Sequence, residues 1–280
     1  MERHQEIERT IIKTYRAHLW APFVKALKEF QLLKPKDKVC VCISGGKDSM
    51  LLAKLFQELK RHSDFEFEFT YLVMNPGYNE RNLKLIQSNL NLLHIDAIVK
   101  NTDIFEIANA QTKTPCYLCA KMRRGALYKL AKELGCNKIA LGHHYDDVIE
   151  TTLMNMLNNG SFQTMLPKLH SDNYEGMELI RPMYFIRERD IQRWVNYNEL
   201  VFLNCACKFT EDINKSKDLT GSKRYDTKLL IKDLLKYNPF VEKNIFKAPF
   251  NVNVDKVIGY KLHNKEISFL DEYDENSSVI

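Results

Sequence analysis

Six consecutive residues near the start of the chain have the side-chain types and spacing of a phosphate-binding loop. They are Ser44, Gly45, Gly46, Lys47, Asp48 and Ser49. The loop follows the apolar run 39–43 and leads into the helix-like stretch 50–56. A glycine-rich turn between a buried strand and a helix directs backbone N–H groups and the positive end of the helix dipole at one point. The spacing therefore predicts a site for the phosphates of a nucleotide.

The loop is not a Walker A motif. That motif needs a Gly-Lys-Ser/Thr triplet with a further glycine upstream, whereas Asp48 follows Lys47 here. The loop instead resembles the pyrophosphate loop of ATP-dependent adenylating enzymes, in which AMP goes to the substrate and pyrophosphate leaves. Backbone N–H groups, the hydroxyls of Ser44 and Ser49, and Lys47 would neutralise charge on the departing pyrophosphate. Asp48 would help to hold Mg²⁺, because such sites recruit one or two carboxylates. The alternative is an ordinary strand-to-helix turn.

Four of the seven cysteines form two close pairs. Cys116 and Cys119 have the C-x-x-C spacing, and Cys205 and Cys207 are separated by one residue. C-x-x-C lets two thiolates reach one metal centre, although it also fits a redox pair or half of a zinc site. A one-residue gap rarely suits a single metal, so we expect one residue of the second pair to be spare. Three thiolates would hold a [4Fe–4S] cluster with one open iron, and a closed four-cysteine zinc site is the alternative.

Length and composition favour a protein with one main domain. The chain has 280 residues, is 45% hydrophobic and carries a formal net charge of +5, with charges of both signs mixed. It has no apolar run of about 18 residues and no basic-then-apolar start, so we expect a soluble, cytoplasmic protein without membrane association. A reducing cytosol argues against a disulfide scaffold.

Strand-like and helix-like segments alternate along most of the chain. We expect a helix at 7–34, strands at 39–43, 67–73, 97–99 and 138–141, and helices at 49–62, 79–91, 103–110, 119–134 and 145–158. This order predicts an α/β fold with a doubly wound parallel sheet, whose ligands bind at the carboxyl ends of the strands. Beyond residue 160 we expect a hairpin, helices at 188–199 and 224–237, and a loosely held acidic tail at 266–280. The predicted units are an N-terminal helical arm at 1–36, a nucleotide-binding and catalytic domain at 37–205, and a C-terminal helical extension at 206–280.

Taken together, four stretches resemble the tRNA 2-thiocytidine synthetase (TtcA-type) family, relatives of the tRNA 2-thiouridine synthetases. The stretches are 42–49, 116–125, 142–150 and 181–191. The resemblance covers roughly residues 10–265. It implies a Rossmann-like fold of the adenine nucleotide α-hydrolase type. It also implies ATP and Mg²⁺ as cofactors and a [4Fe–4S] cluster held by Cys116, Cys119 and a later cysteine, for which we favour Cys207, with Cys205 as the alternative.

The resemblance also implies a reaction and its partners. Such enzymes adenylate a base carbonyl in tRNA and replace its oxygen by sulfur delivered through the open iron. The base is expected to be a cytidine of the anticodon loop, because the extra zinc-binding cysteine pairs of the thiouridine branch are missing from this sequence. The sulfur donor would be a cysteine desulfurase system or sulfide, and a homodimer is expected.

Within this scheme we expect ATP phosphates on residues 44–49 and adenine near Val73 and Met74. Gly142 and His143 are expected to bind the nucleotide as well, and Asp48 and Asp147 to act in catalysis. Helical spacing places Asp147, Glu150 and Thr151 on one face with His143. Arg123 and Arg124 would contact AMP or tRNA phosphate, or else form a solvated basic face.

Two alternatives remain from the sequence. One is an ATP-dependent amide or lysidine-type ligase that uses the same loop and has structural zinc. The other is a non-catalytic, metal-containing RNA-binding protein that has kept the fold.

Overall fold

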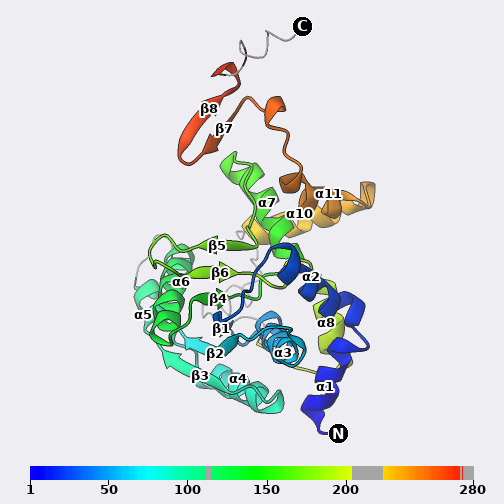
Figure 1. The fold of residues 1–280 in the computed structure, drawn as a ribbon, viewed down its shortest axis with the longest axis vertical. Coiled ribbons are helices and arrows are strands. Elements are labelled where there is room, and N and C mark those ends of the chain that lie inside the picture. The colour runs from blue at the N-terminus through cyan, green and yellow to red at the C-terminus, as the bar shows by residue number, and fades with distance from the viewer. Residues whose placement is uncertain (111–114, 204–222, 272, 274–280) are drawn as a thin grey trace.

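The structure, a computed structural model, describes residues 1–110, 115–203, 223–271 and 273. A six-stranded sheet with the order β3-β2-β1-β4-β6-β5 forms its centre (Figure 1). The strands are β1 (Lys38–Ile43), β2 (Glu68–Asn75), β3 (Ala97–Asn101), β4 (Lys138–Ala140), β5 (Lys168–His170) and β6 (Glu178–Ile180). All neighbouring pairs are parallel except β5 and β6.

Helices connect these strands as the alternating pattern predicted. They are α3 (Lys47–His62), α4 (Glu80–Leu92), α5 (Ile104–Asn109), α6 (Pro115–Glu133), α7 (Tyr145–Asn159) and α8 (Glu188–Tyr197). The expected α/β fold with a mostly parallel sheet is confirmed. Helix α6 begins four residues before the predicted start at residue 119, so both residues of the C-x-x-C motif lie at its beginning.

The two faces of the sheet have separate cores, and β1 contributes to both. Val39, Val41 and Ile43 join the larger core, which includes the N-terminal helices. The alternate residues Cys40 and Cys42 join the smaller core under α6. This alternation follows from the two-residue period of a strand, and it explains these two cysteines as packing residues.

The prediction of one continuous helix over residues 7–34 was wrong. The chain instead forms α1 (Arg3–Ile12), a π-helix (Arg16–Trp20) and α2 (Ala21–Glu29). Apolar residues continue across this π-helix at a spacing of four, at Tyr15, Leu19 and Phe23, as they would in an α-helix. The sequence pattern therefore could not reveal the break.

The expected hairpin after residue 160 is confirmed as β5 and β6, and it joins the main sheet. Strand β6 runs parallel to β4, with Ala140 opposite Ile180. This pairing places Arg181, directly after β6, beside the residues that follow β4 at the carboxyl edge of the sheet.

The C-terminal part begins with α10 (Lys223–Tyr237) and α11 (Val241–Lys247), which both pack on α7. Short 3₁₀ turns then lead to a hairpin of β7 (Gly259–Leu262) and β8 (Lys265–Ser268), which lies at the opposite end of the molecule from the N-terminus (Figure 1). Of the acidic tail predicted at 266–280, residues 266–268 belong to the largely exposed strand β8, and residues 272 and 274–280 lie outside the described part of the chain. No described helix is long and apolar enough to cross a lipid bilayer.

Candidate active site

The loop between β1 and α3 is locked by its own side chains. Gly45 has φ +87°, in the left-handed region that favours glycine, and Gly46 caps α3. The Ser44 N–H donates to Ser49 Oγ at 3.1 Å, and Ser49 Oγ donates to the Gly46 carbonyl at 2.9 Å. The first N–H groups of α3 have no partner within the helix, so they remain available to an anion.

Two segments that are distant in sequence contact the backbone of this loop. A Cβ atom on Gly142 would lie 3.1 Å from the Asp48 carbonyl carbon and 3.2 Å from the Ser49 nitrogen. Glycine at this position therefore lets the end of β4 approach the loop backbone directly. From another side, the Leu203 N–H donates to the Gly45 carbonyl at 3.2 Å.

A cavity of about 630 Å³, here called cavity A, opens at the carboxyl ends of the strands. One part of its wall is apolar and another is cationic. Its described lining is Cys42, Ile43, Ser44, Asp48, Ser49, Met74, Lys121, Arg123, Arg124, Leu127, Leu141, Gly142, His143, Asp147, Leu179 and Arg181. An apolar wall beside clustered cations suits a molecule with a flat apolar ring and an anionic tail.

A second cavity of about 470 Å³, cavity B, lies on another side of the loop. Its described lining is Ser44, Gly46, Lys47, Asp48, Tyr78, Phe105, Arg123, Gln192, Val195, Asn196, Leu200, Val201, Phe202 and Leu203. The two cavities share Ser44, Asp48 and Arg123. The arrangement can hold two different molecules that meet at the loop.

Three buried polar atoms around cavity A have no hydrogen-bond partner in the described part of the chain. They are Asp48 Oδ1, His143 Nδ1 and Arg181 Nε. Burial raises the pKa of Asp48, while His144 and Lys47 offset part of this shift. Burial, with the nearby Arg181 charge, lowers the pKa of His143 to about 4, so this imidazole is neutral at pH 7. Unpaired buried groups are costly unless a ligand satisfies them, so these atoms mark a binding site.

The adjacent histidines have different roles. His144 is the N-cap of α7: its Nδ1 accepts from the Asp147 N–H at 3.4 Å, and its own N–H donates to Asp147 Oδ2 at 2.9 Å. Its Nε2 lies 3.8 Å from Asp48 Oδ1, so the ring stands between the two carboxylates. His143 precedes the helix and lines cavity A. Helical spacing therefore does not place His143, which lies before α7, but it lines cavity A together with Asp147.

The loop lysine is held by two carboxylates. Lys47 Nζ lies 3.2 Å from Asp48 and 3.2 Å from Glu188 Oε1, and Lys228 of α10 binds the other oxygen of Glu188 at 2.5 Å. Although burial alone would raise it, the hydrogen bond from Lys228 and the charges of both lysines lower the pKa of Glu188 to about 2. Glu188 thus connects the loop to the C-terminal part of the chain.

Helix α10 also covers the acidic face of α7. Arg224 lies 3.5 Å from Asp147, 3.3 Å from Glu150 and 3.4 Å from the Thr151 hydroxyl. One guanidinium contacts all three, which confirms that they share a face. Burial, together with the charge of Asp147, raises the pKa of Glu150 to about 7, whereas His144 and Arg224 keep the pKa of Asp147 low despite burial.

The cysteines expected to bind a metal are only partly described. Cys119 is half-buried in α6 and packs against the larger core. It lies four residues before Arg123, about 6 Å along the helix axis, and Arg123 lines both cavities. The backbone of Cys116 belongs to the first turn of α6, but its side chain is outside the described set, as are Cys205 and Cys207 entirely. The second pair begins two residues after Leu203, which lines cavity B.

The two residues expected near adenine separate in the structure. Met74 lines cavity A, whereas Val73 points into the larger core and is fully buried there. Neighbouring residues of a strand face opposite sides, so only one of the two can reach a given cavity.

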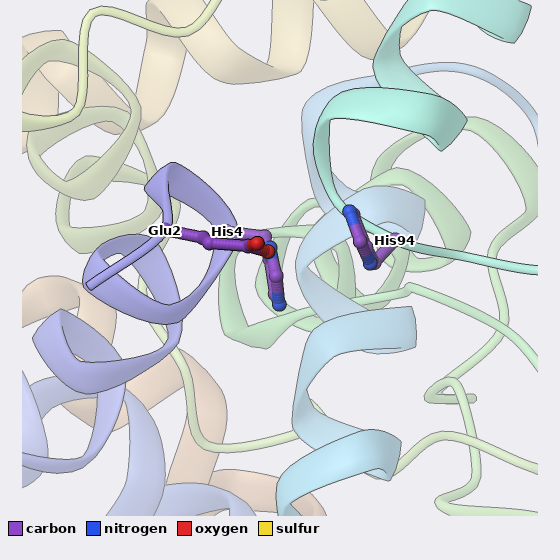
Figure 2. A group of neighbouring side chains, drawn as sticks. All are labelled: Glu2, His4 and His94. Carbon is purple, nitrogen blue, oxygen red and sulfur yellow. The ribbon is translucent and has the colours of Figure 1, made fainter.

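One group of described His, Cys, Asp and Glu side chains could hold a metal ion by distance alone: Glu2, His4 and His94 (Figure 2). The two imidazole rings are stacked, with centroids 3.7 Å apart and planes 14° apart. Ring nitrogens bind metals in the ring plane, so two parallel rings do not direct their lone pairs at one ion. None of the three lines cavity A or B. The stack packs the start of α1 against the end of α4.

Comparison with known proteins decides the family. The PP-loop domain family matches residues 19–213, which is most of the chain. The chain belongs to the PP-loop family. Its relatives include proteins named tRNA-cytidine(32) 2-sulfurtransferase. The one from Coxiella burnetii (strain CbuG_Q212) is 34% identical over 250 residues, covering 86% of this chain and 91% of the relative. The one from Geobacter sulfurreducens is 32% identical over 233 residues, covering 81% and 87%.

Solved structures support the same fold. The U34-tRNA thiolase NcsA from Methanococcus maripaludis, solved with its [4Fe–4S] cluster, superimposes with a TM-score of 0.64 at 20% identity. The match covers 93% of this chain and 88% of that protein. The two proteins therefore share a fold, which agrees with the predicted α/β architecture.

Several residues of the PP-loop site were not singled out from the sequence. Glu188 and Arg181 lie in the stretch 181–191 that carried the family resemblance, but no role was assigned to either. Arg224 and Gln192 had no local signal, because the contacts that bring them to the site are made by residues distant in sequence. Only Arg181 had a usable signal in the sequence: it directly follows the apolar strand residue Ile180, so it could have been placed at the carboxyl edge of the sheet.

Proposed function

We propose that this PP-loop protein is an ATP-dependent tRNA sulfurtransferase that thiolates a cytidine. One observation carries the proposal: two cavities meet at Ser44 and Asp48 of the loop and at Arg123 of the cysteine-bearing helix α6. A reaction that joins ATP to a second substrate needs such a junction. The names of the curated relatives, with 34% identity over most of both chains, support the choice of tRNA cytidine as that substrate.

Cavity A is the proposed ATP site. Its apolar wall, including Met74 and Leu127, suits an adenine ring, while the loop N–H groups suit the phosphates, which Lys47 would reach from the side of cavity B. The neutral His143 can exchange a hydrogen bond with the nucleotide through Nδ1, which has no other partner among the described residues. Arg181 stays charged at neutral pH, because burial lowers its pKa only to about 10.

Asp48 and Asp147 are the proposed Mg²⁺ ligands and catalytic carboxylates. Both line cavity A, and Asp48 Oδ1 is buried without a hydrogen bond among the described residues, with Lys47 Nζ 3.2 Å away as an ion-pair partner. Magnesium at phosphate sites uses one or two carboxylates and keeps several waters. The cation would also relieve the repulsion between these two acids, since the Asp147 charge raises the pKa of Asp48.

The proposed cluster ligands are Cys116, Cys119 and Cys207, with Cys205 as the alternative to Cys207. Cys119 stands one turn before Arg123, so a group bound there would lie beside the junction of the cavities. Three thiolates on [4Fe–4S] leave one iron open, and this iron would supply sulfide when the cluster is bound. The thiolates at the start of α6 gain from the helix dipole, which lowers the pKa of a thiol.

The first chemical step is an attack of the base oxygen on the α-phosphorus of ATP. The O–P bond to AMP forms, the bond to pyrophosphate breaks, and the loop with Lys47 takes up the charge on pyrophosphate. The base carbon then carries AMP, a far better leaving group than oxide. A sulfide equivalent displaces it, giving the thiolated base and AMP. Holding both reactants at one junction replaces a bimolecular encounter.

Two single variants test this proposal. Asp48→Ala should abolish AMP formation and leave the visible absorption of the cluster intact, because the side chain acts only on the nucleotide side. Cys119→Ser should remove that absorption from anaerobically purified protein and leave ATP binding in place. A colourless, zinc-containing wild-type protein would contradict the sulfurtransferase assignment and favour a ligase. Nucleoside mass spectrometry of tRNA from a strain lacking the gene should show loss of one thiolated cytidine.

A further inference from the structure

We propose that cavity B is the pocket for the pyrimidine to be thiolated, and that Gln192 and Asn196 read the Watson–Crick edge of that base. The inference rests on the proposed function, and it names the residues that choose the base. The volume of cavity B, about 470 Å³, is within the usual range for small-ligand pockets. Cavity B borders the loop at Ser44, Gly46, Lys47 and Asp48, so a base in it would lie next to the phosphates of an ATP whose adenine occupies cavity A.

The walls of cavity B suit an unstacked nucleobase. The rings of Tyr78 and Phe105 meet edge to face at a centroid distance of 5.8 Å, and the Tyr78 hydroxyl donates to the Ser44 carbonyl at 3.3 Å. These buried aromatic groups give the pocket an apolar side next to the loop. Enzymes that act on a base must take it out of its stack, and aromatic walls replace the lost stacking.

Polar recognition comes from the exposed face of α8. Gln192 and Asn196 are one helical turn apart and line cavity B, and Gln192 Nε2 donates to Asn196 Oδ1 at 2.8 Å. This bond uses one polar group of each amide. Neither of the remaining groups has a partner within the described chain, so together they offer one donor and one acceptor side by side. A pyrimidine presents a complementary pair at its N3 and its 4-position.

The direction of α8 sets the direction of the base. The helix begins at Glu188, which holds Lys47 of the loop at 3.2 Å, so Gln192 is nearer to the loop than Asn196. The reacting oxygen of a 2-thiolated pyrimidine must face the loop. N3 then lies opposite Gln192, and the 4-amino group of cytosine lies opposite Asn196.

Cytosine requires a donor at Gln192 and an acceptor at Asn196, because its N3 accepts and its 4-amino group donates. In the structure the free groups are Gln192 Oε1 and Asn196 Nδ2, which is the opposite pattern. Rotation of both amide groups by 180° gives the pattern that cytosine requires and keeps one hydrogen bond between them, now donated by Asn196. Uracil presents the opposite pattern, with N3–H and O4. A carboxylate at residue 192 therefore opposes cytosine, whereas a carboxylate at residue 196 still accepts from the amino group.

The two substitutions Gln192→Glu and Asn196→Asp add the same negative charge but should affect cytosine binding differently, and this difference tests the inference. The experiment uses the cluster-loaded enzyme, ATP and a tRNA transcript with cytidine in the anticodon loop, and it measures pyrophosphate release and thiolated nucleoside. Gln192→Glu should lower kcat/KM for this tRNA by roughly 10- to 100-fold more than Asn196→Asp, the usual value of a base contact. ATP affinity should change to the same extent in both variants, because each adds one negative charge to the cavity that Lys47 lines.

A second amide pair in the chain provides the control. Gln87 and Asn91 of α4 have the same i, i+4 spacing, with Gln87 Nε2 donating to Asn91 Oδ1 at 3.0 Å, and line neither cavity A nor B. Gln87→Glu and Asn91→Asp should leave kcat/KM unchanged. Equal losses from Gln192→Glu and Asn196→Asp, a larger loss from Asn196→Asp, or losses no greater than in the control pair would overturn the inference. If wild-type enzyme formed neither AMP nor thiolated nucleoside with any tRNA, the proposed function itself would fall.

Discussion

The substitution Glu188→Gln should destabilise the fold and at the same time tighten ATP binding. The carboxylate of Glu188 binds Lys47 at 3.2 Å and Lys228 at 2.5 Å, and 29% of its side chain is exposed. Its pKa falls from the usual value near 4.5 to about 2. At about 1.4 kcal/mol per pKa unit, this corresponds to about 3 kcal/mol of stability at pH 7.

The pH dependence has a defined sign. The pKa of Glu188 is lower in the folded state than in the unfolded state, so its contribution is complete above pH 4.5 and is lost as the pH falls toward 2. Above pH 4.5, Glu188→Gln should therefore lower the free energy of unfolding by up to about 3 kcal/mol. The difference from wild type should shrink below that pH.

ATP binding should change in the opposite direction. Lys47 is shared between Asp48 and Glu188 before nucleotide binds, so the phosphates must compete for it. Removal of the Glu188 charge leaves one competitor fewer, and ATP or pyrophosphate should bind more tightly.

Urea unfolding at pH 7 and titration with a fluorescent ATP analogue measure the two effects. Glu80→Gln is the matched control, because Glu80 pairs with Lys84 at 2.6 Å with both side chains at least 75% exposed. Such surface pairs contribute about 0.5 kcal/mol or less. The reasoning fails if Glu188→Gln unfolds like Glu80→Gln, or if ATP binds it more weakly than wild type.

Two further substitutions test the packing and the electrostatics of the site. Gly142→Ala would place a methyl group against the backbone of Asp48, so ATP affinity should fall at least tenfold. The control is Gly125→Ala, whose added methyl group would have nothing within 4 Å and should stabilise α6 by about 0.5–1 kcal/mol. Equal ATP affinity in the two variants would contradict the close approach of Gly142 to the loop. Burial raises the pKa of Glu150 from 4.5 to about 7, so folded protein holds this proton more tightly and wild-type stability should fall as the pH rises from 4.5 to 7. Between pH 5 and pH 8 the free energy of unfolding of wild type should fall by about 3 kcal/mol, and that of Glu150→Gln should not. A variant less stable than wild type at pH 8 would show instead that the ion pair between Glu150 and Arg224 dominates.

The sequence was most informative where the structure is local. The loop 44–49 is formed by the end of one strand and the start of the next helix, so composition and order were enough to locate it. The helices that return the chain to the sheet have amphipathic patterns of ordinary length, and their bounds agreed within a few residues. The hairpin β7–β8 was missed although its turn residues, His263 and Asn264, are of types that adopt positive φ more often than most, as both do in the structure.

The sequence was least informative where partners are distant. Arg224 is 77 residues from Asp147, and nothing in either neighbourhood indicates their ion pair. The same holds for Leu203, whose N–H binds the Gly45 carbonyl of the loop. Such contacts depend on how helices settle on the sheet, and spacing along the chain does not encode that.

These distant contacts also explain how the two halves of the proposed reaction can be linked. The segment that carries the second cysteine pair begins after Leu203, which is bonded to the phosphate loop, and ends before Arg224, which is bonded to the acidic face of α7. The described residues on either side of that segment, Leu203 and Arg224, therefore contact the loop and Asp147, both of which are expected to respond when ATP binds. Glu188 joins the same two regions through Lys47 and Lys228. A change in phosphate occupancy would redistribute these ion pairs, so we expect nucleotide binding to be transmitted from the loop to α10 through Glu188.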